Sequence, residues 1–197
     1  MKKVISRSAS EIERQPQVVG SAIDLSSLCD MHPRLRLACD MAGVMVIRAA
    51  LGLQRNGHSS GVDFQMAIES VVSRCALIWP AADLSSAAQH DSKRITEDGA
   101  EAIALAVAHK MRAWCVVRRL QQGEHADWLL EHHENGARKL VAFEVSGTDQ
   151  RSITDPMRVK LAQVAKKRDV DHRCAGIVGF KRPEVALQSV KARNCDR

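Results

Sequence analysis

Apolar residues recur along this chain in patterns that predict helices in its first half. Across residues 33–55 they recur at spacings of three and four, which predicts one face of a helix. The same spacing predicts a second helix over residues 62–77. Residues 81–94 are polar and predict a linker, and residues 1–20 predict a disordered or loosely attached leader. Residues 21–94 are therefore expected to form a helical N-terminal region with its linker.

The second half of the chain predicts a mixture of helices and strands. A helix opens at Thr96 as N-cap and continues through a strongly helix-forming stretch at residues 100–111. The elements expected after it are strands at 114–120, 127–130 and 139–147, a helix at 156–168, a strand at 174–180 and a last helix at 185–192. The first three strands can form an antiparallel meander, and the crossover helix lets the fourth strand join in parallel. Residues 95–197 therefore predict an α/β domain with a mixed sheet and helices on both sides.

Two neighbouring strands of this predicted sheet each carry one carboxylate. The turn at residues 134–136 contains an Asn-Gly pair that favours a hairpin, so Asp127 and Glu144 are expected near each other at the strand ends. Two unit charges roughly 4 Å apart repel by roughly 4 kcal/mol at an effective dielectric of about 20. A divalent metal ion between them would turn that cost into binding energy. The pair is therefore a candidate metal site.

Glu101 is an acid within a helix that is apolar on most sides. An unpaired buried charge is costly, so a buried Glu101 needs a partner or a function. In the alternative interpretation, Glu101 faces the exposed side and pairs with Arg94 or another surface base. The sequence leaves both interpretations open.

The order of elements around these acids resembles the PD-(D/E)xK nuclease superfamily. Its signature is an Asp followed by Glu-x-Lys on the next strand, often with a Glu in the first helix and a Gln or Lys in the second. The matching residues here are Asp127, then Glu144-Val145-Ser146, with Glu101 before them and Lys160 and Gln163 after them. The resemblance covers roughly residues 95–190 and implies a restriction-endonuclease-like αβββαβ core preceded by a small helical region.

The resemblance implies a metal-dependent nuclease that hydrolyses DNA phosphodiester bonds. Asp127, Glu144, the backbone carbonyl of Val145 and Glu101 would be the oxygen ligands of Mg²⁺ or Mn²⁺. Ser146 occupies the position of the usual lysine, and Lys160 in the following helix lies where a replacement lysine would come from, with Gln163 as an accessory group. Losing a charge-stabilising donor commonly costs on the order of 10²–10³ in rate.

A catalytically inactive module that keeps this fold, and binds nucleic acid or a protein within a larger complex, is the alternative function. The resemblance implies defence against foreign DNA, mobile-element processing or repair as contexts, and the sequence does not choose among them. The helices expected at residues 33–79 are candidates for DNA recognition, for homodimerisation or for docking a partner protein.

The charge of the chain fits contact with nucleic acid. Its formal net charge is +6, and the basic residues Arg118, Arg119, Lys166 and Lys167 are candidate phosphate contacts. Such a basic run is also common on an ordinary solvated helix face. Aromatic residues make up 3% of the chain, which argues against a surface that binds single strands by base stacking.

Cysteine and histidine residues predict neither a metal clip nor a catalytic pair. The six cysteines are scattered without zinc-like spacing, and reduced thiols in a cytoplasmic protein are expected. No apolar run approaches the length of a membrane span, so no membrane contact is expected. His58 lies beside Ser59 and Ser60, but adjacent loop residues rarely face one another. The histidines expected at the surface are His32, His90, His132 and His133.

Overall fold

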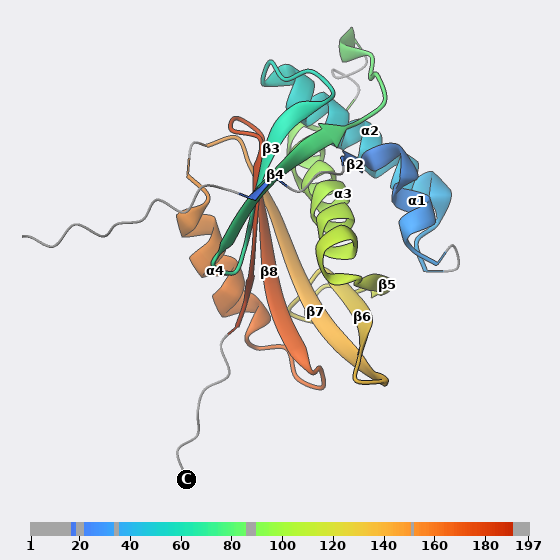
Figure 1. The fold of residues 1–197 in the computed structure, drawn as a ribbon, viewed down its shortest axis with the longest axis vertical. Helices are drawn as coiled ribbons and strands as arrows, with labels where there is room; N and C mark the ends of the chain where they lie inside the picture. Colours follow the sequence, from blue (N-terminus) through green and yellow to red (C-terminus); the bar gives the residue numbers. More distant parts are fainter. Residues whose placement is uncertain (1–16, 19–21, 34–35, 86–89, 151, 191–197) are drawn as a thin grey trace, which may run out of the picture.

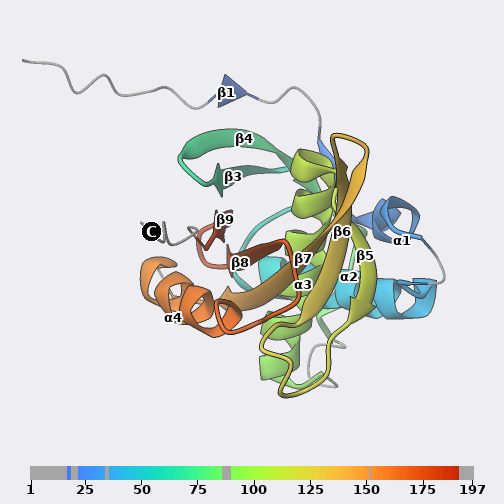
Figure 2. The ribbon, with the colours of Figure 1, turned by 90° about the horizontal axis from the view of Figure 1, so that it is seen from below.

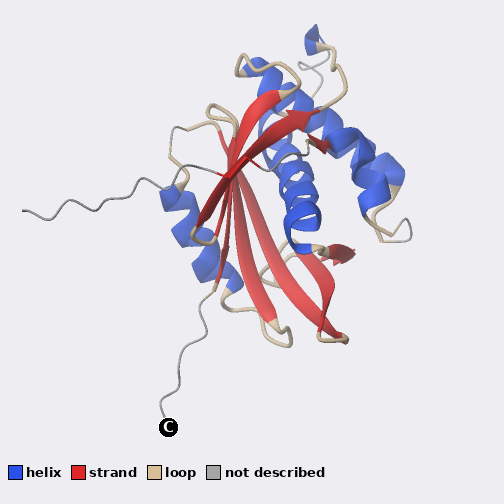
Figure 3. Ribbon diagram, in the orientation of Figure 1, coloured by secondary structure: helices blue, strands red, loops and turns tan. Residues whose placement is uncertain are grey.

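The computed structural model describes residues 17–18, 22–33, 36–85, 90–150 and 152–190, which form a mixed sheet with helices on both faces (Figure 1, Figure 3). The helices are α1 (Leu28–Met31), α2 (Cys39–Arg55), α3 (Ser92–Arg112) and α4 (Thr154–Val164), with a short 3-10 turn at Leu25–Ser27. The strands are β1 (Gln17–Val18), β2 (Ile23–Asp24), β3 (Val62–Ile68), β4 (Val71–Ile78), β5 (Cys115–Arg119), β6 (Trp128–Glu134), β7 (Ala137–Thr148), β8 (His172–Gly179) and β9 (Glu184–Ser189).

The sheet confirms the predicted strand pairing in the second half of the chain. Its order is β1-β4-β3-β9-β8-β7-β6-β5, with β2 paired to β4. Strands β5, β6 and β7 form an antiparallel meander, and β8 lies parallel to β7. Strand β9 runs antiparallel to β8 and parallel to β3, so it carries the sheet into the β3–β4 hairpin. The predicted α/β class with a mixed sheet is therefore confirmed.

Helices α3 and α4 lie against opposite faces of the sheet, which curls around α3, and α2 packs on the outer side of α3 (Figure 1, Figure 2). Every residue of α3 from Asp98 to Ala108 is buried, because the helix has the sheet on one side and α2 on another. Small residues permit this close packing. A Cβ atom at Gly99 would lie 2.9 Å from the Cα of Ala49 in α2.

The helix predicted over residues 62–77 is wrong, because these residues form the β3–β4 hairpin. Phe64, Met66 and Ile68 are buried on β3 while Asp63, Gln65 and Ala67 between them are more exposed. Phe64 and Ile68 were compatible with a helix, because residues four apart share a face at a period of 2 as well as at 3.6. Parallel pairing of β3 with β9 selects the strand.

The last predicted helix, over residues 185–192, is also wrong within the described residues. Residues 184–189 form β9, which lies between β8 and β3. Neighbouring strands and helices cover both of its faces, so the run Val185-Ala186-Leu187 is buried without alternation. A short continuous apolar run fits a buried strand and a buried helix equally well.

Helix boundaries differ from the prediction where caps were misassigned. Helix α3 begins at Ser92, because the Asp91 side chain accepts hydrogen bonds from the backbone N–H groups of Lys93 and Arg94 at 2.7 and 3.2 Å. Thr96, the predicted cap, instead accepts a hydrogen bond from Arg55 at 2.6 Å. Helix α4 begins at Thr154 and ends at Val164, four residues before the predicted end.

Most of the leader predicted over residues 1–20 lies outside the described residues. Gln17 and Val18 are described, and they form β1, which pairs in parallel with β4. Among the helices that the structure describes, none has the length and the apolar character needed to cross a membrane.

A disulfide between Cys29 and Cys39 joins α1 to the start of α2. The prediction of reduced thiols is therefore wrong for this pair, because the intervening chain folds back and brings the two Cα atoms to 5.1 Å. Cys75, Cys115 and Cys174 are free thiols, and Cys195 lies outside the described residues.

Gly147 on β7 marks a close approach of the sheet to α3. A Cβ atom at this position would lie 2.3 Å from the Thr96 carbonyl oxygen and 3.0 Å from the Ala100 Cβ. We expect Gly147→Ala to lower the free energy of unfolding by about 1–3 kcal/mol, because the backbone of α3 must move to admit a methyl group. Urea unfolding measures this change.

Gly43→Ala is the control for Gly147→Ala, since Gly43 is exposed on α2 and no neighbour lies within 4 Å of its Cβ position. We expect this change to stabilise the protein by about 0.5–1 kcal/mol through helix propensity. A Gly147→Ala protein as stable as the wild type would contradict the close packing of β7 on α3.

Candidate functional site

Glu144 and Lys160 meet on the face of the sheet that α4 covers. Phe143 and Val145, the neighbours of Glu144 on β7, point to the opposite face and join the core that contains α3. Lys160 in α4 donates a hydrogen bond from Nζ to Glu144 Oε1 at 2.5 Å. The Glu144 side chain is 1% exposed and that of Lys160 is 24% exposed. Lys160 therefore points at the acid rather than into bulk solvent.

Asp127 lies where β6 begins, beside the part of β7 that continues past β6. Its Oδ2 accepts a hydrogen bond from the backbone N–H of Val145 at 2.7 Å, and its own N–H donates to the Phe143 carbonyl at 3.2 Å. The Asp127 carboxylate thus accepts the hydrogen bond that a backbone carbonyl would accept from Val145 if β6 extended further along β7. Because the N–H and C=O of a strand residue point to the same side, the Val145 carbonyl also faces this end of β6.

Glu101 is buried in α3 and forms an ion pair with Arg119 of β5. Its Oε1 accepts a hydrogen bond from Arg119 Nη2 at 2.8 Å, and the Arg119 guanidinium lies over the Trp128 ring, 5.3 Å from its centroid. The interpretation in which Glu101 is exposed and pairs with Arg94 is wrong. Arg94 instead lies 3.9 Å from Asp98, which belongs to the next turn of α3.

Asp127 interacts with both Glu101 and Glu144, and burial disfavours the charged form of all three acids. Burial raises the pKa of Glu101 to about 8 against the attraction of Arg119, and Asp127 raises it further. Burial likewise raises the pKa of Glu144, where Lys160 lowers it and Asp127 raises it. Burial raises the pKa of Asp127, against the Val145 N–H, Lys160 and Arg119. Asp127 therefore lies within electrostatic reach of both ion pairs.

One carboxylate oxygen on each of two acids has no hydrogen-bond partner among the described residues. These atoms are Oε2 of Glu101 and Oε2 of Glu144, and both are buried. A buried, unpartnered carboxylate oxygen is costly unless a proton, a water molecule or a cation satisfies it. Carboxylate and carbonyl oxygens are the ligands that Mg²⁺ and Mn²⁺ prefer. The oxygens of Glu101, Asp127, Glu144 and the Val145 carbonyl are of this chemical type, but among the described residues the three acids do not form a group whose ligand atoms all lie within 4.8 Å of one another.

Glu101 gives the metal-free protein a stability that falls as pH rises. Its pKa is about 8 in the folded protein against an ordinary value of 4.5, so between about pH 4.5 and pH 8 the folded state holds a proton that the unfolded chain has released. We expect Glu101→Gln to remove this loss of stability. Between about pH 5 and pH 9, its free energy of unfolding should rise relative to that of the wild type by on the order of 3 kcal/mol. Urea unfolding with a chelator present, at both pH values, measures the difference.

The control for Glu101→Gln is Glu97→Gln, which changes a half-exposed acid in the same helix. This control is expected to follow the wild-type pH dependence. If Glu101→Gln also follows it, Glu101 is ionised in the folded protein throughout this range, and burial does not dominate its electrostatics.

The remaining predicted site residues lie in different surroundings. Gln163 is half-buried on α4, three residues after Lys160, and no hydrogen bond links its side chain to the three acids. Arg118 donates two hydrogen bonds to Glu124, at 2.9 and 2.8 Å, and Lys167 donates to the same carboxylate at 3.3 Å. Lys166 is exposed. The structure therefore gathers Glu101, Arg119, Asp127, Glu144 and Lys160, which we call the acid–base cluster.

The histidines differ from the surface placement predicted for them. His32 is 3% exposed, so that prediction is wrong for it, because α3 and β5 pack over the end of α1. Burial, together with His109, lowers the pKa of His32 to about 4. His133 is exposed, and His90 and His132 are half-buried. His58 contacts the Phe180 carbonyl at 2.9 Å.

A second group of potential ligands was missed by sequence reasoning. His32, His109 and Cys115 each offer one ligand atom, and these three atoms lie within 4.8 Å of one another. His32 ends α1, His109 lies in the last turn of α3, and Cys115 begins β5. No local spacing joins His32 to the other two, so the sequence holds no signal for this group.

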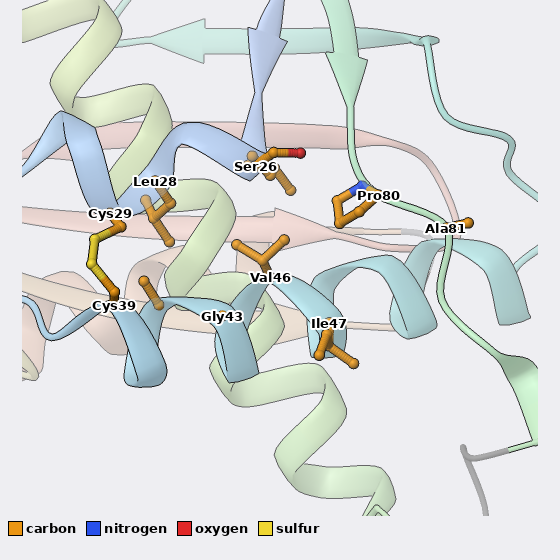
Figure 4. A pocket seen from close by; sticks show the side chains of 11 residues that line it. Ser26, Leu28, Cys29, Cys39, Gly43, Val46, Ile47, Pro80 and Ala81 are labelled. Atoms are coloured by element: carbon orange, nitrogen blue, oxygen red, sulfur yellow. A yellow bond between two sulfur atoms is a disulfide. The ribbon is translucent and has the colours of Figure 1, made fainter.

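An apolar groove of about 520 Å³ lies between α2, the segment before it and the chain after β4 (Figure 4). Leu28, Val46, Ile47 and Pro80 line it beside the Cys29–Cys39 disulfide (Figure 4). None of its lining residues is ionisable, and none belongs to the acid–base cluster. The groove is therefore separate from the candidate site.

Comparison with known proteins adds no relative of this chain. No protein-family model, no curated protein and no solved structure matches it. Its candidate chemistry therefore rests on its own residues and their geometry.

Proposed function

We propose that this protein hydrolyses DNA phosphodiester bonds in a reaction that depends on Mg²⁺ or Mn²⁺. Asp127, Glu144 and the Val145 carbonyl would hold the ion, and Glu101 would contribute from the α3 side. The observation that carries the proposal is that Asp127 lies within electrostatic reach of both Glu101 and Glu144, each of which has a buried, unpartnered carboxylate oxygen. The elements that carry these residues occur in the order α3-β5-β6-β7-α4-β8, within an α/β sheet that β9, β3 and β4 extend further.

The chain's own residues would supply orientation and charge to this reaction. When bound, the ion polarises the phosphodiester and lowers the pKa of the attacking water. Lys160 lies at 2.5 Å from Glu144 Oε1, so its ammonium would orient that water and offset charge that builds on the phosphate. The N–H of Val145 holds Asp127 in place through a 2.7 Å hydrogen bond.

Basic residues beyond the cluster would provide the DNA contacts. Lys166 and Arg168 are exposed just after α4, the helix that carries Lys160. Phosphate contacts of this kind confer affinity without sequence preference, and they weaken as salt rises. Arg118 and Lys167 are engaged with Glu124, so each would have to exchange that carboxylate for a phosphate.

Cleavage assays on the full chain test the proposed function by metal removal and replacement. Supercoiled plasmid, linear duplex and single-stranded DNA are incubated with chelator alone, with Mg²⁺ and with Mn²⁺. We expect nicked or shortened products with either ion and none with chelator. Cleavage that persists in chelator would contradict a metal-dependent reaction, because the acids alone carry no strong Lewis acid.

A catalytically inactive binding module is the second candidate function, and two observations favour it. Ser146 occupies the position of the usual lysine on β7, and Lys160 is already engaged by Glu144. Salt-dependent DNA binding without cleavage of any substrate, together with no Mg²⁺ or Mn²⁺ binding by calorimetry, would select this function over hydrolysis.

A further inference from the structure

The group formed by His32, His109 and Cys115 lies at the junction of three elements. His32 follows the last residue of α1, His109 lies near the end of α3, and Cys115 is the first residue of β5. The two imidazole rings meet edge to face, with centroids 5.4 Å apart. The Cys115 Sγ lies 3.7 Å from His109 Nδ1. Imidazole nitrogen and thiolate sulfur are the ligands that Zn²⁺ and related transition metals prefer.

The spacing of these atoms is close to that of a tetrahedral metal site. Metal–nitrogen and metal–sulfur bonds of about 2.0 and 2.3 Å place neighbouring ligand atoms roughly 3.3–3.6 Å apart. The Cys115–His109 separation of 3.7 Å already approaches this range, and all three ligand atoms lie within 4.8 Å of one another. Side-chain movements of about 1 Å would complete the geometry. The Met31 carbonyl oxygen, 4.0 Å from Cys115 Sγ, or a water molecule is available for the fourth position.

The hydrogen bonding of His32 leaves it short of partners in a buried setting. Its Nε2 is buried and has no hydrogen-bond partner among the described residues. Its Nδ1 faces the N–H of Val116 at a long 3.3 Å. Unpaired buried polar atoms are uncommon and call for a specific explanation, such as a bound ion or water molecule. Metal binding at His32 would compete with one long contact only.

We propose that His32, His109 and Cys115 bind one transition-metal ion of the Zn²⁺ class at a site separate from the acid–base cluster. The bond formed at sulfur releases the Cys115 proton to solvent, so the ion is held by one thiolate and two neutral imidazoles. Because three chain segments supply the ligands, the ion would tie α1 and β5 to the end of α3.

The proposed metal site and the acid–base cluster share α3 and β5, but they lie at different points along these two elements. Glu101 and His109 are eight residues apart on α3, which corresponds to about 12 Å of helix. Arg119 and Cys115 are four residues apart on β5, which corresponds to about 13 Å of strand. A metal ion at the second site would therefore support the α3–β5 packing that holds the Glu101–Arg119 pair, without contacting the pair.

Cobalt substitution in the full chain, stripped of metal and free of any histidine tag, tests this site. No thiol reductant is added, so the Cys29–Cys39 disulfide stays intact. We expect one equivalent of Co²⁺ to produce visible bands of tetrahedral cobalt and a thiolate-to-cobalt charge-transfer band, and Zn²⁺ to displace them. At Zn²⁺ concentrations about 100-fold above the dissociation constant, the melting temperature should rise by about 5–10 °C.

Matched variants separate this site from other thiols and from the acids. Cys115→Ser should remove the charge-transfer band, and His109→Ala should weaken cobalt binding by more than about 10-fold. Cys75→Ser, which changes another free buried thiol, and Glu144→Gln, which changes the acid–base cluster, should leave both signals unchanged. Absence of tetrahedral bands in the wild type, or a charge-transfer band that survives Cys115→Ser, would overturn the proposal. Because the readout is spectroscopic, the outcome of this experiment does not depend on whether the protein cleaves DNA.

Discussion

Glu144→Ala is expected to abolish Mg²⁺-dependent cleavage of plasmid DNA. The variant would lose a direct oxygen ligand of the ion, and with it the carboxylate that holds Lys160 at 2.5 Å. Loss of a group that merely supports a ligand costs roughly 10–100-fold in metal affinity or activity. We therefore expect a fall in the single-turnover cleavage rate on the order of 10³ or more, with DNA affinity close to that of the wild type.

Two further variants make the Glu144→Ala result interpretable. Glu144→Gln keeps the volume of a side chain that is 1% exposed, so its loss of cleavage cannot be assigned to a cavity. Glu124→Ala removes a different paired acid, one that binds Arg118 and Lys167, and should cleave at the wild-type rate when DNA is saturating, although it frees both bases for phosphate contacts. Thermal melts confirm that each protein is folded. Wild-type cleavage by a folded Glu144→Gln protein would remove this cluster from the mechanism.

Lys160→Ala is expected to lower the cleavage rate by on the order of 10²–10³, since it removes a positive charge beside the reacting phosphate. A second change in this background should restore part of the rate. Ser146 shares the face of Glu144 on β7 and is half-buried toward α4, so Ser146→Lys would return a lysine to the position that the Glu-x-Lys signature uses. Single-turnover rates of the wild type, Lys160→Ala and the double variant measure the loss and its recovery.

Lys166→Ala is the control for Lys160→Ala, because it removes an exposed lysine just after the end of the same helix. It should weaken DNA binding modestly and reduce its salt dependence, while the cleavage rate at saturating DNA stays the same. If Lys160→Ala behaves like Lys166→Ala, Lys160 contributes phosphate affinity rather than charge stabilisation at the reacting centre. Recovery by Ser146→Lys would show that the two positions serve one purpose.

The acid–base cluster also explains why metal, stability and pH should be linked in this protein. Burial raises the pKa of Glu101, Asp127 and Glu144 together, so the contribution of these three acids to the stability of the metal-free fold is largest where they are protonated. An ion bound to them would favour their ionised forms instead. Divalent metal should therefore stabilise the wild type more at high pH than at low pH, and Glu101→Gln should weaken that dependence.

Turn chemistry and the pattern of apolar residues were sufficient to predict the meander and to place Asp127 and Glu144 at its neighbouring strands. The Asn-Gly turn and the apolar runs on either side specify the β6–β7 hairpin, and the hairpin places Asp127 and Glu144 at the same end of the sheet. The helical spacing of α4 placed Lys160 on a flank beside its core face, and the resemblance to the nuclease superfamily implied its position near Glu144, where the structure has it. These features depend on contacts between segments close in the chain, for which period and turn type are informative.

Long-range packing decided the features that sequence reasoning misassigned. The four-residue spacing of Phe64 and Ile68 fits both a helix and a strand, and pairing with both β4 and β9 selects the strand. The run in β9 is continuous because the α3 core covers one of its faces and α4 covers the other, so its pattern holds no period. In the same way, burial of Glu101 beside Arg119 depends on how β5 packs against α3.

The sequence by itself therefore determined the α/β class and the antiparallel meander with its parallel fourth strand. Only the tertiary structure decided that residues 62–78 extend the sheet, that Glu101 pairs with Arg119, and that His32 meets His109 and Cys115. The physical reason is the distance along the chain. Periodicity and turn chemistry report local geometry, whereas which buried surfaces meet depends on the free energy of packing the whole chain at once.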